Sequence, residues 1–216
     1  MVPSTPKGEA SRAHILQTAA SVFAAKGYSA ATFQDLIAAS GMTKGAFYFY
    51  FQSKETLAWA VLERKQREWL QRVSSALEQT SDPKTADPKA GDPKTADPKM
   101  ALTALADIML DLHDDDPSAW SISKLTKDLA QIPSLAEQAR QSMRQWVDLV
   151  AELIRAAQAS GQARQDVDAD TMAGVLVAGF DGLKALHDVI NAGSQRAPFE
   201  DGVRTFARLT EEFLFG

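Results

Sequence analysis

The residues best suited to binding chemistry lie in one short segment, Thr32 to Glu55. Its sequence, TFQDLIAASGMTKGAFYFYFQSKE, places hydroxyls, lysines and aromatic rings on both sides of Gly41. Hydroxyl and ammonium groups donate hydrogen bonds to DNA phosphates and to base edges. The chemistry that this segment indicates is therefore recognition of a nucleic acid.

Two short helices joined by a turn are predicted to position these groups. Thr32 with Asp35 three residues later is a capping-box pattern that begins the first helix. Gly41 ends that helix, and Thr43 caps a second one that runs to Phe51. Apolar residues stand where the two helices must pack: Leu36, Ile37, Met42, Phe47 and Phe51. The pattern is that of a helix-turn-helix.

The second helix is predicted to expose one polar face. Phe47 and Phe51 are four residues apart and point inward, which leaves Thr43, Lys44, Gly45 and Tyr48 outward and Tyr50 at the side. A helix in the major groove presents its N-terminal residues to base edges. We therefore expect Thr43 and Lys44 to reach bases, Gly45 to allow close approach, and both tyrosines to reach phosphates.

Two further DNA contacts are expected at helix starts, where free amides and the helix dipole favour phosphate. They are Thr32, which begins one helix, and Lys54, which begins the helix after the pair. The alternative is that the aromatic run FYFYF (47–51) only fills a core. Five consecutive aromatic residues on one short helix cannot all point inward, however, and an exposed cluster beside lysines needs a partner.

The charge is divided unevenly along the chain. Residues 1–72 carry nine basic and five acidic residues, whereas residues 73–216 carry 14 basic and 23 acidic ones. A basic head on an acidic body suits a DNA-binding protein better than the overall charge of −5 suggests. The absence of cysteine excludes disulfides and thiolate metal sites, and the start of the chain lacks the apolar core of a signal peptide. A soluble cytoplasmic protein is expected.

Helical periodicity predicts an all-α fold of about nine helices. One helix precedes the pair and ends at Gly27, a long one runs from Ser53 to about Gln79, and further helices are expected over 100–112, from Asp116, from Pro133 to about Ser160, over 168–192 and over 198–215. Between them, DPK recurs every five residues in 82–99. Its four prolines, including Pro98, and its lack of apolar residues predict a disordered, extended insertion. We therefore divide the chain into a DNA-binding domain, 1–52, and a ligand-binding and dimerisation domain, 53–216.

The head resembles the tetracycline-repressor family of bacterial regulators, through the stretches ILQTAASVFAAKGYSAATF, IAASGMTKGAFYFYF and SKETL. The resemblance is close over residues 15–57, and the later helices agree only in layout. It implies a homodimer that binds a near-palindromic operator, usually as a repressor released by a small ligand. It also implies DNA contacts by the matching residues Thr32, Thr43, Lys44, Gly45, Tyr48, Tyr50 and Lys54. Tyr50 stands where the family often has His, and Ile37 where Ala is common.

The later helices carry large apolar residues that are expected to line a pocket for a small apolar or amphipathic ligand. They are Met109, Trp120, Met143, Trp146, Phe180 and Leu183, with His187 as a polar orienting group. The alternative for each of them is ordinary core. Trp146, in WVDLVAELIRAAQASGQARQDVD, resembles a pocket tryptophan of the γ-butyrolactone-receptor branch of the family. The last two helices are apolar on more than one face and are the expected dimer interface.

Enzyme motifs are missing: there is no glycine-rich phosphate loop, no HExxH and no nucleophile elbow. His113 beside Asp114 to Asp116 is interpreted as a solvated loop, so no metal and no cofactor is expected. The hypothesis is a homodimeric transcriptional repressor without a membrane partner. Its alternatives are a DNA-binding regulator without ligand control, an activator, a helical binding module that does not bind DNA, and a helical enzyme.

Overall fold

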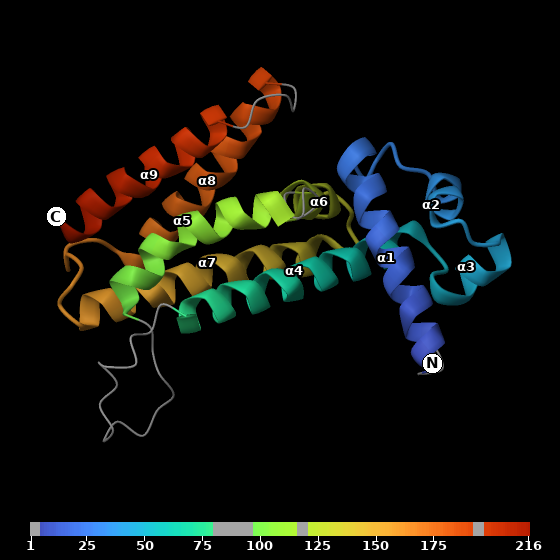
Figure 1. Cartoon of the computed structure of the whole chain (residues 1–216), viewed down its shortest axis with the longest axis horizontal. Coiled ribbons are helices and arrows are strands. Elements are labelled where there is room, and N and C mark those ends of the chain that lie inside the picture. The colour runs from blue at the N-terminus through green and yellow to red at the C-terminus, as the bar shows by residue number, and fades with distance from the viewer. Residues whose placement is uncertain (1–4, 80–96, 116–120, 192–196) are drawn as a thin grey trace. The chain divides into compact units, whose positions relative to one another are not determined.

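The computed structural model describes residues 5–79, 97–115, 121–191 and 197–216. These residues form nine helices and no strand, which confirms the predicted all-α class for the described part of the chain (Figure 1). The helices are α1 (Pro6–Lys26), α2 (Phe33–Ser40), α3 (Lys44–Tyr50), α4 (Lys54–Gln79), α5 (Pro98–Asp115), α6 (Ser121–Leu129), α7 (Ala136–Ala159), α8 (Ala169–Asn191) and α9 (Ala197–Phe215).

The chain packs as two compact units. The first consists of Met1–Trp69 with Asp115–Met143, and the second of Leu70–Asp114 with Arg144–Gly216. Both α4 and α7 contribute residues to each unit. The predicted DNA-binding segment, 1–52, therefore shares its packing unit with the beginning of α4, with α6 and with the beginning of α7.

Local capping defines the ends of the helix-turn-helix pair. Thr32 and Asp35 form the predicted capping box, in which the Asp35 N–H donates to the Thr32 hydroxyl (3.1 Å) and the Thr32 N–H donates to the Asp35 carboxylate (2.9 Å). Gly41 ends α2 at a φ of 65°, in the left-handed region that glycine adopts without strain. The Thr43 hydroxyl then accepts from the Ala46 N–H (3.3 Å) and begins α3. The turn between the helices follows from residues within the segment itself.

One apolar core holds α1, α2 and α3 in the first unit. Phe23, Leu36 and Phe47 are almost fully buried, together with Leu57 and Leu62 of α4. Burying each such side chain is worth about 1.5–3 kcal/mol. Because Phe47 is 0% exposed, its burial sets the face that the short helix α3 turns inward and, with it, the face left for solvent.

The second unit has a smaller core, formed by α5, α7 and α8. Its buried residues are Val150, Ala151, Ile154, Ala169 and Ala173, and Trp146 is among the half-buried residues packed against them. In Figure 1, α8 and α9 run side by side, and their contact is the most extensive one between helices of this unit.

The repeat differs from its prediction at its C-terminal end. Pro98 is the first residue of α5 rather than part of an extended segment. Proline is tolerated in the first turn of a helix, where its missing N–H would have had no helical partner. Residues 80–96, which hold the rest of the repeat, lie outside the described residues, as do the predicted helix start at Asp116–Pro117 and Trp120. Within the described ranges, no helix is both long and apolar enough to cross a bilayer.

Candidate nucleic-acid interface

The N-terminal part of α3 presents a polar face to solvent. Thr43, Lys44 and Gly45 are exposed, and Tyr48 is 40% exposed. A Cβ on Gly45 would meet no atom within 4 Å, so packing inside the chain does not require glycine there. The space over Gly45 is therefore open for another molecule to approach the backbone of α3 closely.

Aromatic packing holds the Tyr48 ring at the edge of this face. The ring lies 5.1 Å from that of Phe33 in an edge-to-face arrangement, and Phe33 packs in the same way on the buried Phe47 (5.2 Å). The Lys44 ammonium lies 5.8 Å from the centre of the Tyr48 ring. The Tyr48 hydroxyl and the neighbouring Lys44 ammonium thus lie at a ring whose position is fixed by Phe33 of α2.

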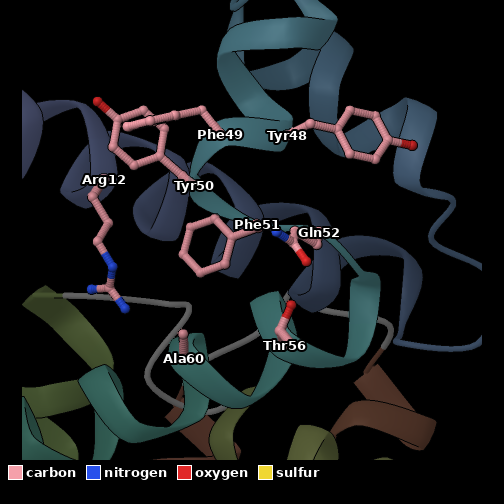
Figure 2. A pocket seen from close by; sticks show the side chains of 8 residues that line it. All are labelled: Arg12, Tyr48, Phe49, Tyr50, Phe51, Gln52, Thr56 and Ala60. Carbon is pink, nitrogen blue, oxygen red and sulfur yellow. The ribbon is translucent and has the colours of Figure 1, made fainter. Parts of the chain in front are cut away.

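The C-terminal part of α3 borders an open hollow in the first unit. The hollow has a volume of about 640 Å³, and its walls come from Arg12 of α1, from residues 48–52, and from Thr56 and Ala60 of α4 (Figure 2). Phe49 is 57% exposed and packs edge-to-face on Tyr50 (5.2 Å). The exposed rings of the aromatic run therefore surround a polar recess, and the prediction that this run cannot be core alone is confirmed.

Lys54, predicted as a phosphate contact, is half-buried and makes contacts within the chain. Its ammonium donates hydrogen bonds to the backbone carbonyls of Tyr28 (3.1 Å) and Ala31 (3.0 Å). It also lies 4.2 Å from the centre of the Tyr28 ring. Two of its three N–H groups thus hold the loop between α1 and α2, and only the third is left for another partner.

Tyr28 connects that loop to two helices of the first unit. Its N–H donates to the Asp128 carboxylate of α6 (3.1 Å), and its hydroxyl donates to the Glu55 carboxylate of α4 (3.4 Å). Burial of the ring, followed by the Glu55 charge and this hydrogen bond, raises the pKa of Tyr28 to about 12. The same hydrogen bond contributes to a lowered pKa of Glu55, whose largest cause is its own backbone N–H. The loop before α2 is therefore anchored at several points.

Thr32 is exposed but already engaged in its cap. Its hydroxyl donates to the Asp35 carboxylate (2.8 Å), which also forms an ion pair with Lys26 (2.9 Å). The hydrogen bond from Lys26, followed by those from Thr32, lowers the pKa of Asp35 to about 2. Lys26 offsets the only carboxylate of the α2 cap, which reduces its repulsion of a polyanion near Thr32.

The structure separates the predicted ligand-binding residues into different surroundings. Trp146 packs against the core of the second unit, whereas Phe180 and His187 of α8 contact Phe199 of α9, with ring centroids 6.3 and 5.3 Å apart. Leu183 approaches Gly202 of α9. Met143 is half-buried in the first unit, and the side chain of Met109 and all of Trp120 lie outside the described residues. Of the five predicted residues whose side chains the structure describes, none lines the hollow described above.

Sequence reasoning did not identify five residues that line the hollow: Arg12, Phe49, Gln52, Thr56 and Ala60. Phe49 carried a signal, because it lies in the aromatic run between two tyrosines. No sequence pattern marked Arg12 or Gln52, because both residues lie outside the two helices of the pair. Whether they come close to each other depends on how α1 crosses that pair.

Comparison with known proteins identifies both parts of the chain. The family model for bacterial regulatory proteins of the tetR family matches residues 15–61, and the model for the C-terminal part of BetI-type transcriptional repressors matches residues 98–214. The transcriptional repressor DhaR of Mycobacterium sp. strain GP1 is 27% identical over 172 residues, 79% of each chain. The repressor KstR2 of Mycolicibacterium smegmatis is 29% identical over 171 residues, 79% of this chain and 76% of that one. These relatives are regulators of transcription, not enzymes.

More distant comparisons, one of sequence and two of structure, also extend over most of the chain. The A-factor receptor protein of Streptomyces griseus is 24% identical over 177 residues, 81% of this chain and 54% of that protein. A TetR transcriptional regulator from Chloroflexus aurantiacus superposes with a TM-score of 0.74 at 23% identity, covering 97% and 98% of the two chains. A transcriptional regulator from Saccharomonospora viridis, solved in complex with choline, superposes with a TM-score of 0.75 at 21% identity, covering 96% and 99%. The resemblance of Trp146 to one branch of the family stays a prediction.

Proposed function

Since the chain belongs to the TetR family of bacterial regulatory proteins, we propose that it is a homodimeric repressor that leaves its operator when a small molecule binds. That it is a DNA-binding regulator follows from the family. The repressor role, the dimer, the ligand and the contact residues are the proposal, and action on bacterial DNA places it in the cytoplasm.

The polar face of α3 carries this proposal. Thr43 and Lys44 stand at the N-terminus of a helix whose opposite side is anchored by the fully buried Phe47, so they can meet base edges in the major groove. Gly45 lets the helix backbone approach the DNA. Tyr48 and Tyr50 donate to phosphates, and we propose Thr32 and the third N–H of Lys54 as further phosphate contacts.

Selection of bound fragments from random duplex DNA by the full-length protein tests the proposal. A near-palindromic sequence should emerge, with half-sites about 34–36 Å apart. Lys44→Ala should then weaken binding to the selected DNA by roughly 1–3 kcal/mol if it reads a base. Arg67→Ala is the matched control, because it removes an equal charge from an exposed position of α4. Binding that shows no sequence preference, or that Lys44→Ala leaves unchanged, contradicts the assignment.

Exposed apolar side chains on α8 and α9 support a dimer through these helices. Val175, Leu186, Val189 and Ile190 of α8 and Leu209 and Phe213 of α9 are each about half exposed or more. Exposed apolar side chains of this number on two neighbouring helices favour an association site. Val189→Glu should convert the protein to a monomer in light scattering and weaken operator binding, whereas Ala156→Glu, at an exposed position of α7 outside this surface, is the control for added charge.

The ligand is proposed to bind in the second unit beside Trp146, where α5, α7 and α8 share a core. The regulator of the same fold from Saccharomonospora viridis was solved in complex with choline, which supports the proposal of a small-molecule ligand. A ligand releases DNA only if it binds the DNA-incompetent arrangement more tightly. Because α4 begins at the DNA-binding helices and contributes to both units, we propose that it transmits the change.

Tryptophan fluorescence and operator binding, measured together during a metabolite screen, test the sensor. An inducer should change both, and Trp146→Ala should blunt the response while the ligand-free protein still binds DNA. If Trp146→Ala unfolds the protein and no metabolite changes the fluorescence, Trp146 is core and the alternative of a regulator without ligand control is favoured. Transcription of a reporter that rises rather than falls with the protein would indicate an activator.

A further inference from the structure

The open hollow beside α3 combines hydrogen-bond donors with aromatic surface. Arg12, Tyr50 and Gln52 supply a guanidinium, a phenol hydroxyl and an amide, while the exposed Phe49 and the buried Phe51 supply rings. Its volume, about 640 Å³, lies within the range of about 300–1,000 Å³ that is typical of ligand sites. A DNA backbone has the same dual chemistry, an anionic phosphate between apolar faces of deoxyribose.

Arg12 is held in place without being neutralised. Its guanidinium carbon lies 5.4 Å from the centre of the Phe51 ring, and that ring is only 4% exposed and therefore fixed. Among the described residues, no carboxylate pairs with Arg12. A guanidinium positioned by an aromatic ring loses less entropy when it binds a phosphate through two parallel hydrogen bonds. The residue is thus a cation prepared for an anion.

The two tyrosines of α3 face different surroundings. Figure 2 shows the Tyr48 and Tyr50 rings extending in opposite directions from the helix; the Tyr50 ring lies on the side of Arg12, but its hydroxyl is turned away from the Arg12 guanidinium. Tyr48 packs on Phe33 of α2 and beside Lys44, Tyr50 packs on Phe49, and both line the hollow. Two hydroxyls that point to opposite sides of one helix cannot donate to the same phosphate.

We propose that the hollow between α1, α3 and α4 binds one phosphodiester group of the operator backbone, with Arg12 and Gln52 as its donors. The proposal rests on the proposed function and extends it, because it adds α1 and Gln52 to the DNA-binding surface. Phe49 at the rim contacts the adjoining deoxyribose. The contact is to the backbone, so it strengthens binding to every DNA sequence.

The salt dependence of binding tests this site in the full-length protein. Fluorescence anisotropy with the selected operator and with an unrelated duplex is measured from low to high NaCl for wild type, Arg12→Gln, Arg12→Lys and Arg67→Gln. Arg12→Gln should weaken both duplexes about tenfold and reduce the slope of log K against log salt by about 0.9, the value for one phosphate. Arg12→Lys should keep the slope and recover only part of the affinity, and Arg67→Gln should match wild type.

Double variants locate the donors. Residues that bind the same phosphate do not act independently, so the fold-losses of Arg12→Gln and Gln52→Ala should combine to less than their product. Those of Arg12→Gln and Tyr48→Phe should multiply. Unchanged slope and affinity in Arg12→Gln, or a loss confined to the operator, overturns the phosphate site. Wild-type protein that binds neither duplex would instead refute the proposed function, so the two failures are distinguishable.

Discussion

Replacement of Lys54 by Met tests whether this lysine holds the protein or the DNA. The change keeps an apolar chain of similar length and removes the ammonium, which donates to the carbonyls of Tyr28 and Ala31 and lies 4.2 Å from the Tyr28 ring centre. Hydrogen bonds from a charged group are worth about 1.5–3 kcal/mol each, and a cation–π contact at a partly exposed site about 0.5–1 kcal/mol.

The expected loss of local stability is smaller than the sum of these terms. The site is only partly buried, so water can replace part of what the ammonium provides to the two carbonyls. We therefore expect Lys54→Met to destabilise the loop before α2 by about 2–4 kcal/mol. Amide hydrogen exchange in residues 27–36, followed by mass spectrometry, should then accelerate about 30-fold or more in the ligand-free protein.

Lys44→Met is the matched control, because Lys44 is exposed on α3 and, within the described part of the chain, contacts only the Tyr48 ring. It should leave exchange in residues 27–36 unchanged and still weaken binding to the selected DNA. The reasoning about Lys54 is refuted if Lys54→Met exchanges like wild type and its only effect is a lower affinity and a smaller salt slope. Lys54 would then be a phosphate contact without a structural role.

Three further predictions concern the same unit. Absorbance at 295 nm, compared between wild type and Tyr28→Phe, should show the Tyr28 phenolate forming near pH 12. Because the pKa of Tyr28 is raised above 10.0, the stability that the protonated phenol contributes is present below pH 10 and is lost as the pH rises to about 12. For Asp35 the pH dependence of stability is reversed: the pKa is lowered from 3.8 to about 2, so the stability that the carboxylate contributes is present above about pH 4 and lost as the pH falls to 2. An acid titration of Asp35→Asn followed by circular dichroism should lack that part of the unfolding transition. Gly45→Ala should stabilise α3 by about 0.5 kcal/mol, because alanine has the higher helix propensity, and so raise the melting temperature slightly. It should nevertheless reduce operator affinity. Undiminished affinity would show that DNA does not approach Gly45.

The sequence by itself determined the helices of the pair and the face that α3 exposes. Thr32 with Asp35, Gly41 and Thr43 are signals whose partners lie within three residues, so the caps form wherever the segment folds. The position of Phe47 in the helical period set the inward face. The sequence also determined that part of the aromatic run 47–51 lies at the surface, because one short helix cannot bury five adjacent rings.

Tertiary structure decided the roles of charged groups whose partners are far away in the chain. The carbonyls that bind Lys54 lie 23 and 26 residues before it, and the carboxylate that binds the Tyr28 N–H lies 100 residues after it. It likewise brought Arg12 to the Phe51 ring and packed Phe180 and His187 on Phe199. An ammonium or a guanidinium on a flexible chain donates to any oxygen, or packs on any ring, within reach, so its partner depends on how the helices cross, which no local pattern encodes.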